Sequence, residues 1–333
     1  MKRDSNLYAK IAEPENLLLA FRKAARGKRT RPEVSAFAAN VPDEIASLRA
    51  DLLAEQVEVG NYRYFRVYEP KERLICAAPF RERVLHHAMM NVGEENLERY
   101  AVSASYACRR GQGLHRAVAA AQQHCRSRRC YLKLDIRRFF DSIDHAIVLK
   151  LLQRRFNDPP LLRLFDRILD SYHVIPGKGL PIGNLVSQHL ANFYLGRFDH
   201  FVKETLRARF YIRYMDDFVF WSDSRDELRT ILERCRVFLA DDLALALKPP
   251  QLNHSAAGLP FLGFRLYPVR IDLGPLARRR FIRRFRAYEQ RHVRGLWSEE
   301  ELLAHVEPLL AFVKTADSLG FRRYVMTRYG VVT

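Results

Sequence analysis

The nonapeptide RYMDDFVFW, residues 213–221, is the most informative segment of this 333-residue chain. Asp216 and Asp217 stand side by side between two short runs of aromatic and β-branched residues, a composition typical of strands. Residues 210–221 therefore predict two strands that flank an Asp-Asp turn. Adjacent carboxylates at the tip of such a hairpin repel each other, and a divalent cation is the usual counter-charge.

A third carboxylate follows in a second segment, LKLDIRRFFDSID, residues 132–144. Apolar residues alternate with polar ones over 131–136, which predicts a half-buried strand with Asp135 opposite its apolar face. Three aspartates from neighbouring strands would form an oxygen-rich site suited to Mg²⁺. A pair of such ions, about 3.5–4 Å apart, can hold the attacking and leaving oxygens of a phosphoryl transfer. A lone Asp-Asp pair is more often a solvated turn, so the catalytic interpretation depends on both segments.

The composition narrows the classes of function. Lys and Arg number 56 against 38 Asp and Glu, a net charge of +18, and 48% of the residues are hydrophobic. The hydrophobic content excludes a disordered basic tail, and the charge favours nucleic acid over an acidic membrane as partner. We find no secretory signal, no run near the ~18 apolar residues of a membrane span and no phosphate-binding glycine motif. Five scattered cysteines indicate reduced thiols, so we expect a cytoplasmic protein.

The order of strand, helix and strand hairpin in the middle of the chain predicts an α+β fold with an antiparallel sheet. Helices are expected over residues 16–31, 80–92, 117–123, 185–198 and 225–240, and after a cap at Asp144. Hairpins are expected over 62–77, turning at Pro70 and Lys71, and over PFLGFRLYP, residues 260–268. Residues 278–294 hold eight arginines and one glutamate, and with helices over 299–315 and 316–329 they predict a basic bundle.

The YMDD sequence of residues 214–217 and the segment around Asp135 resemble the polymerase motifs of reverse transcriptases. The order of the other motifs agrees with that family over about residues 16–330. The resemblance implies a right-hand polymerase fold, with an N-terminal extension, the fingers and part of the palm over residues 1–130. The palm would follow over 131–275, interleaved with fingers helices over about 145–205, and a basic helical thumb over 276–333. It also implies an RNA-directed DNA polymerase that uses two Mg²⁺ ions, for which Mn²⁺ can substitute.

The same resemblance assigns roles to single residues. Asp135, Asp216 and Asp217 would be catalytic, and together with Ile136 they would form the metal site. Contacts to the incoming nucleotide are implied for Arg66, Arg73, Phe140, Ile182, Gly183 and Gln188. Contacts to template and primer are implied for Arg109, Arg110, Gly263, Arg278, Arg279, Arg280, Arg283 and Arg284.

Some of these residue roles, and a further one for Lys248, have competing interpretations. Phe140 would exclude a ribose 2′-hydroxyl, but it could instead be a core aromatic. Lys71 competes with the arginines of the 62–77 hairpin for the triphosphate, and those arginines could simply protect a solvated sheet edge. Lys248 is a candidate general acid toward pyrophosphate, although the lysine of the family aligns nearer Gln251.

The segment LPIGNLVSQ, residues 180–188, departs from most reverse transcriptases, which carry Gln-Gly and Ser-Pro there. Its Ile-Gly and Ser-Gln pairs resemble the reverse transcriptases of diversity-generating retroelements, which copy a template-repeat RNA into cDNA with errors mainly opposite adenine. An isoleucine at position 182 keeps the volume of glutamine without its hydrogen bonds, so base selection would be weaker. The implied partners are the template-repeat RNA, the cDNA or primer strand, dNTPs and a small basic oligomeric accessory variability protein, with no membrane.

Two other interpretations remain open. The chain could be a reverse transcriptase of another bacterial lineage, such as a retron, group II intron, CRISPR-associated or phage-defence enzyme. It could also be a non-catalytic RNA-binding protein on a decayed polymerase fold. The intact aspartates and Phe140 argue against the second of these.

Overall fold

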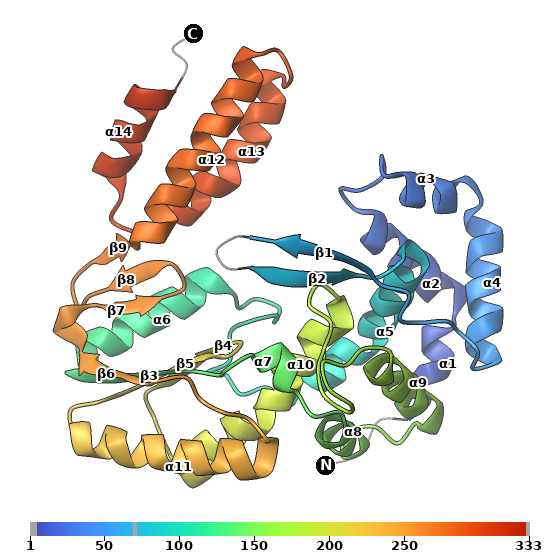
Figure 1. The fold of residues 1–333 in the computed structure, drawn as a ribbon, viewed down its shortest axis with the longest axis horizontal. Helices are drawn as coiled ribbons and strands as arrows, with labels where there is room; N and C mark the ends of the chain where they lie inside the picture. Colours follow the sequence, from blue (N-terminus) through green and yellow to red (C-terminus); the bar gives the residue numbers. More distant parts are fainter. Residues whose placement is uncertain (1–4, 69–71, 331–333) are drawn as a thin grey trace. The chain divides into compact units, whose positions relative to one another are not determined.

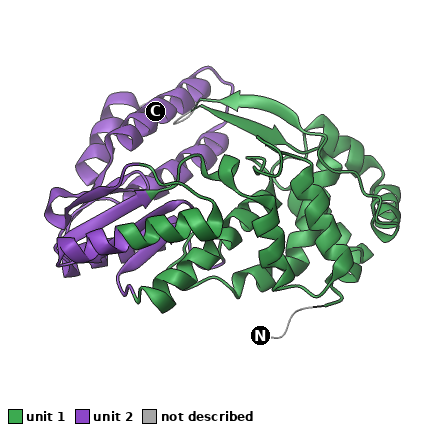
Figure 2. Cartoon of the chain, turned by 60° about the horizontal axis from the view of Figure 1, so that its bottom comes forward, with its two compact units in different colours: residues 1–109, 135–207, 233–248 green, residues 110–134, 208–232, 249–333 purple. Residues whose placement is uncertain are grey.

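The computed structural model describes residues 5–68 and 72–330 as helices and short strands (Figure 1), which confirms the α+β class. The chain forms two compact units whose segments alternate along the sequence (Figure 2). Unit 1 contains residues 1–109, 135–207 and 233–248, and unit 2 contains residues 110–134, 208–232 and 249–333. The turn predicted at Pro70 and Lys71 lies outside the described residues.

Unit 2 is built on a four-stranded sheet with the strand order β4-β5-β3-β6. Its strands are β3 (Cys130–Asp135), β4 (Tyr211–Tyr214), β5 (Asp217–Ser222) and β6 (Gln251–His254). The predicted Asp-Asp hairpin is confirmed, because β4 and β5 pair antiparallel with Tyr214 opposite Asp217. β3 pairs antiparallel with β6 on its other side. The boundary between the units falls inside β3, so Leu134 belongs to unit 2 and Asp135 to unit 1.

The two central strands, β3 and β5, are more deeply buried than the alternation of apolar and polar residues predicts. Phe218 and Phe220 of β5 are fully buried, and so is Leu132 of β3. Tyr131, expected on the exposed face of β3, is only 2% exposed. The prediction of a half-buried strand is therefore wrong for Tyr131, and the polar positions Lys133 and Asp135 alone keep partial exposure. Helix α6 (Leu114–Ser127) packs against β4.

The rest of unit 2 is a small sheet followed by three helices. β7 (Leu259–Phe261) and β8 (Phe264–Leu266) form the predicted hairpin, and β9 (Ile271–Leu273) adds a third strand that was not expected. A short 3-10 turn, η2 (Ser255–Ala257), precedes them. The basic helix α12 (Pro275–Val293) packs against α13 (Glu299–Lys314) and α14 (Leu319–Tyr329). The predicted helical bundle is thus confirmed.

Unit 1 is mainly helical. Its helices are α1 (Leu7–Ile11), α2 (Pro14–Ala25), α3 (Pro32–Ala39), α4 (Val41–Leu53), α5 (Phe80–Glu98), α7 (Phe139–Ser142), α8 (His145–Gln153), α9 (Pro159–Asp170), α10 (Leu185–His200) and the π-helix η1 (Phe201–Thr205). α2 packs on α5, and it ends before residue 31 because Gly27 adopts a left-handed φ of 69°. Helix α11 (Arg225–Leu243) begins in unit 2 and ends in unit 1. The predicted cap of α8 is present, since Asp144 accepts the N–H of Ile147 at 3.2 Å.

A two-stranded hairpin completes unit 1. β1 (Arg63–Val67) pairs antiparallel with β2 (Arg73–Ala77), as predicted for residues 62–77. The base of this hairpin is anchored by Tyr62, whose hydroxyl lies 2.9 Å from that of Ser171. Across the described ranges, we find no helix with the length and apolar character needed to cross a bilayer.

Candidate active site

The Asp-Asp turn of unit 2 has an unusual backbone. Met215 adopts a left-handed φ of 53°, although it is not a glycine, and strained residues of this kind concentrate at functional sites. The Arg213 side chain is fully buried, and its guanidinium donates to the Met215 carbonyl at 3.1 Å. Asp216 and Asp217 are held half-exposed by this turn. Sequence reasoning missed Arg213, whose only signal is a charged residue inside an apolar strand.

A lysine of the neighbouring strand lies against this turn. The Lys133 ammonium is 2.9 Å from Oδ2 of Asp217, and the two side chains are only 17% and 20% exposed. Sequence reasoning also missed Lys133. Its signal is a position two residues before Asp135, which places both on the same face of β3.

Asp135 lies in unit 1 beside the segment that ends at Lys248. The Lys248 ammonium donates to Oδ1 of Asp135 at 2.7 Å, and the Lys248 N–H donates to the Asp135 carbonyl at 2.8 Å. Ile136, which is fully buried, forms a β-bridge with Leu247. The structure therefore brings Lys248 to the carboxylate. Gln251, where the lysine of the family aligns, pairs with Lys133 instead.

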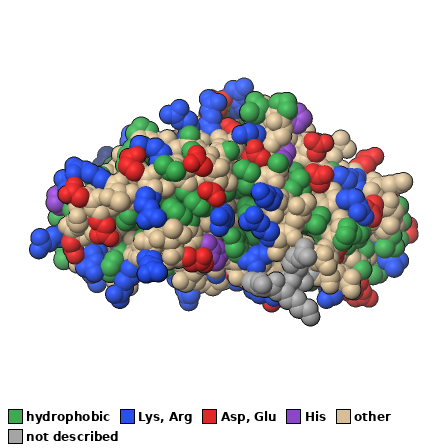
Figure 3. Space-filling view, turned by 90° about the horizontal axis from the view of Figure 1, so that it is seen from below, with side chains coloured by type: hydrophobic (Ala, Val, Ile, Leu, Met, Phe, Trp, Pro, Cys, Tyr) green, Lys and Arg blue, Asp and Glu red, His purple; other side chains and the backbone are tan. Residues whose placement is uncertain are grey.

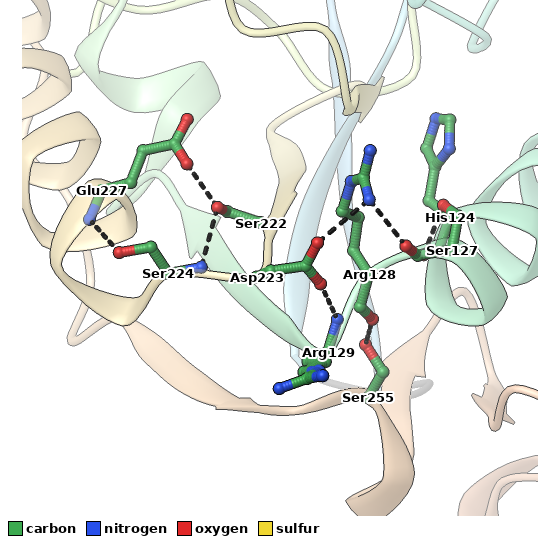
Figure 4. Close-up of polar contacts among 9 residues, drawn as sticks. All are labelled: His124, Ser127, Arg128, Arg129, Ser222, Asp223, Ser224, Glu227 and Ser255. Carbon is green, nitrogen blue, oxygen red and sulfur yellow. Dashed lines mark hydrogen bonds and ion pairs between the residues drawn. The ribbon is translucent and has the colours of Figure 1, made fainter.

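Asp223 connects the start of β3 to the end of β5 (Figure 4). Its carboxylate accepts the backbone N–H of Arg129 at 2.9 Å and the guanidinium of Arg128 at 3.0 Å. Ser255 donates its N–H and its hydroxyl to the carbonyls of these two arginines, each at 2.7 Å. The start of β3 therefore meets the end of β5, so the two strands run in opposite directions. Within unit 2, β3 therefore runs toward the Asp217 turn, and Lys133 of β3 pairs with Asp217 there.

Several predicted nucleotide contacts come together in unit 1. The Phe140 carbonyl accepts the N–H of Leu180 at 2.8 Å, and the Ile182 carbonyl accepts that of Cys76 in β2 at 2.8 Å. Gly183 has a φ of 115°, and a Cβ there would lie 2.9 Å from the Ile75 side chain. Backbone contacts thus place the half-buried Phe140, the Ile-Gly pair and β2 next to one another. Burial raises the pKa of the Cys76 thiol, which keeps it protonated.

The two predicted arginines of the hairpin are exposed. Arg73 begins β2 opposite Val67, and Arg66 lies one position further along, opposite Leu74. The Arg66 guanidinium is paired with Glu72 at 2.5 Å, with both side chains more than half exposed. Exposed pairs of this kind contribute little stability. Gln188 is exposed in the first turn of α10.

The two arginines predicted to contact template differ in their surroundings. Arg109 is 14% exposed, and its guanidinium donates to the carbonyls of Val102 and Ser105 at 2.6 and 2.9 Å. It lies 3.6 Å from Glu98, so it braces its own loop. Arg110 is exposed.

The arginines of α12 have two kinds of surroundings, and Arg286 shares both. Arg278 stacks on Phe321 and Arg286 on Tyr329, with 5.6 and 5.0 Å to the ring centroids, and these contacts hold α14. A groove on α12 is lined by Arg279, Ile282, Arg283, Arg286, Ala287 and Gln290. On the face shown in Figure 3, basic and acidic side chains are interspersed. Positive charge therefore does not cover that face uniformly. On α12, in contrast, arginine side chains are concentrated locally.

The donor set of the aspartates fits a hard divalent cation. Within residues 5–68 and 72–330, no three His, Cys, Asp or Glu side chains form a preassembled metal centre. Mg²⁺ does not require one, because it usually binds through one or two carboxylates, water and substrate phosphates. The half-exposed carboxylates of Asp135, Asp216 and Asp217 offer oxygen ligands of this kind.

Comparison with known proteins gives consistent results. The reverse transcriptase (RNA-dependent DNA polymerase) family pattern matches residues 69–266. Protein YkfC of Escherichia coli K12 is 24% identical over an alignment of 328 residues. The match covers 82% of this chain and 86% of YkfC. The group II intron-encoded protein LtrA of Lactococcus lactis subsp. cremoris is 26% identical over 147 residues, 42% of this chain and 24% of LtrA.

Two solved telomerase structures share the fold. Telomerase from Candida albicans, in complex with a TWJ fragment of telomeric RNA, has a TM-score of 0.51 and 10% identity. Apo telomerase from Candida tropicalis has a TM-score of 0.53 and 10% identity. The matches cover 83% and 81% of this chain but only 57% and 59% of the telomerase chains. At this identity the likeness concerns the right-hand polymerase fold alone.

Proposed function

Because this chain belongs to the reverse transcriptase (RNA-dependent DNA polymerase) family, we propose that it copies an RNA template into DNA through Asp135, Asp216 and Asp217. The observation that supports this most strongly is the strained turn that holds Asp216 and leads into Asp217, the first residue of β5, which is the strand next to β3. β3 ends at Asp135. Carboxylates at these positions suit the binding of the metal ions that phosphoryl transfer requires.

The roles of the individual side chains follow from their chemistry. When bound, two Mg²⁺ ions, or Mn²⁺ in their place, would stabilise the charge that develops on the transferred phosphoryl group. Asp135 and Asp216 would be direct ligands, with Asp217 and the Ile136 backbone close by. Arg66 and Arg73 would hold the triphosphate, because a guanidinium forms paired hydrogen bonds with phosphate oxygens.

Lys248 would protonate the leaving pyrophosphate, since its ammonium already lies at Asp135. Phe140 would exclude a 2′-hydroxyl, Gln188 would contact the nucleotide, and Gly263 would lie at the primer hairpin. Arg109 and Arg110 would lie near the template. Arg278, Arg279, Arg280, Arg283 and Arg284 of α12 would contact the phosphates of the duplex.

Extension of a DNA primer on an RNA template tests this proposal. We expect Mg²⁺-dependent synthesis by the wild-type protein, and loss of at least about 10³-fold in rate for Asp216→Asn, which removes a charged ligand. The circular dichroism spectrum of that variant should match the wild type. Wild-type extension by Asp216→Asn would contradict the assignment of the site.

We propose further that the enzyme is the reverse transcriptase of a diversity-generating retroelement, acting in the cytoplasm of a bacterial or phage-infected cell on a template-repeat RNA. Ile182 and Gly183, with Ser187 and Gln188, support this lineage. The Ile182 carbonyl accepts the N–H of Cys76 in β2, and Leu180, two residues earlier, donates to the Phe140 carbonyl, so Ile182 would act on base selection near these segments. The likeness to YkfC and LtrA is also compatible with the other bacterial lineages.

The error spectrum tests the lineage. Ile182→Gln should add hydrogen bonds near the nascent base pair and lower misincorporation, most of all opposite adenine. Sequencing cDNA that both proteins make on one RNA template provides the comparison. An unchanged spectrum would mean that the errors arise elsewhere in the protein.

The predicted accessory protein needs a separate test. Two basic proteins repel each other unless RNA bridges them, so we expect RNA-dependent association with a small basic oligomeric protein encoded beside this gene. The candidates for the RNA contact lie near the N-terminus and are Lys23, Arg26, Lys28, Arg29 and Arg31. Co-purification with and without nuclease measures the dependence, and no complex under either condition would argue against this lineage.

A further inference from the structure

Lys133 makes a second contact on the side away from the Asp-Asp turn. Its ammonium donates to the Pro260 carbonyl in β7 at 2.9 Å, in addition to its 2.9 Å pair with Asp217. The nitrogen also lies 5.9 Å from the centroid of the Phe261 ring. One side chain therefore links the catalytic turn to the hairpin of β7 and β8, and every partner belongs to unit 2.

The hairpin that Lys133 reaches is itself rigidly built. Leu262 and Gly263 both have positive φ angles, 50° and 89°, at its two-residue turn. Gly263 packs closely on α13, because a Cβ at this position would lie 3.2 Å from the Phe312 ring. The Gly263 carbonyl also accepts the N–H of Gly274 at 2.9 Å. A displacement of β7 would therefore be transmitted to the α12–α13 helices.

The chemistry of this link suits a lysine. An ammonium has three donors, so it can bind a carboxylate and a carbonyl at the same time. Lys133 is mostly buried, so its loss would leave the Asp217 charge and the Pro260 carbonyl without this donor in a poorly solvated place. The ammonium of a lysine on a solvated surface would not be held by two fixed acceptors in this way.

We infer that Lys133 is a positioning residue for the polymerase reaction, because it sets the distance between the Asp217 turn and the β7–β8 hairpin. The inference rests on the proposed function, in which this hairpin holds the primer end. The role of Lys133 is to align the primer 3′-hydroxyl with the carboxylates. A displacement of about 1 Å in such an alignment can reduce the rate about 100-fold while binding is retained.

Single-nucleotide extension by Lys133→Met tests the inference. We expect kcat to fall about 10- to 100-fold, while the Kd for primer–template, measured by fluorescence anisotropy, stays within about threefold of wild type. Lys133→Arg should recover most of the rate, because a guanidinium can also bridge a carboxylate and a carbonyl. The combination of Lys133→Met with Asp217→Asn should lose little more than Asp217→Asn alone, because both changes break the same link.

Arg126→Met is the matched control. Arg126 also donates to a backbone carbonyl of this small sheet region, that of Pro268 at 2.7 Å, but has no contact with the catalytic turn in the described structure. Its kcat should equal that of the wild type. Thermal unfolding of each variant identifies a loss of fold, and Lys133→Ala, which also removes every side-chain donor, provides a second truncation.

The outcomes separate the two proposals. No Mg²⁺-dependent extension by the wild-type protein would overturn the proposed function and the role of Lys133 with it. Normal extension by folded Lys133→Met or Lys133→Ala would overturn the role of Lys133 alone. So would a rate loss accompanied by an equal loss of primer–template affinity, or no recovery in Lys133→Arg.

Discussion

Gly183 allows its loop to pack closely against β2. Its φ of 115° disfavours any side chain, and the nearest atom to a Cβ would be the Ile75 side chain at 2.9 Å. We predict that Gly183→Ala lowers the free energy of unfolding by about 1–3 kcal/mol, from backbone strain and the contact with β2. Urea denaturation measures the change.

Gly27→Ala is the comparison. Gly27 has a positive φ of 69°, within the left-handed region, and nothing lies within 4 Å of a Cβ there. Its destabilisation should therefore be the smaller of the two. Equal losses would mean that neither the less favourable φ of Gly183 nor its contact with Ile75 adds to the cost.

His86 is a second residue with a predictable effect, on the dependence of stability on pH. It is 1% exposed, and burial, followed by the charge of His87, lowers its pKa to about 3. The unfolded chain therefore binds a proton near pH 6.5 that the folded chain rejects, so stability falls as the pH drops below 6.5. The slope contributed by His86 approaches about 1.4 kcal/mol per pH unit.

His86→Leu should remove that slope, measured as the free energy of unfolding between pH 5 and 7. Glu82, whose carboxylate lies 3.4 Å from His86, has a pKa raised by burial, and its contribution runs in the opposite direction. It remains in the variant, so the difference between the two curves isolates His86.

Among the elements, the β3–β5 pair depends on the Asp223 carboxylate. We predict that Asp223→Ala lowers the free energy of unfolding by about 1–2 kcal/mol, because the Arg129 N–H and the Arg128 guanidinium lose their acceptor. Asp223→Asn should lose less, since its amide oxygen still accepts the N–H. Asp226→Ala removes a neighbouring exposed pair with Arg229 and should be nearly neutral. An equally large loss in Asp226→Ala would contradict the link.

The elements also show what a sequence can predict. The Asp-Asp hairpin, the strand before Asp135, the Asp144 cap and the helices after residue 275 were predictable, because each carries a local pattern of apolar residues or a cap. β6 was missed because it is a mostly exposed strand of four residues without alternation. The contacts of Lys133 and Arg213 were missed because they depend on β7 and on the strained turn.

At the scale of the whole molecule, excess positive charge predicts how nucleic acid binds. Replacing Arg279 and Arg283 in the α12 groove by glutamine should weaken primer–template binding similarly for unrelated sequences. The slope of log K against log salt should decrease by up to about 1.8, if both contact phosphates. Anisotropy titrations at several salt concentrations provide the measurement.

Arg229 and Arg236 on α11 are the matched controls. Each is paired with an acidic residue three positions away, Asp226 and Glu233, so it carries little unbalanced charge. Their replacement by glutamine should leave the slope unchanged. A fall in slope as large as that of the α12 pair would mean that net charge alone governs binding.

The alternation of the two units has a consequence for the newly made chain on the ribosome. Six segments alternate between the units, and the last segment of unit 1 ends at Lys248. Unit 1 therefore cannot finish folding until that segment has been translated. The hydrogen bond between Lys248 and Asp135 also cannot form before then. Chains whose domains follow one another can fold each domain as it emerges. Here each unit is completed only by segments translated later, so the nascent protein should depend on chaperones and on a slow rate of translation.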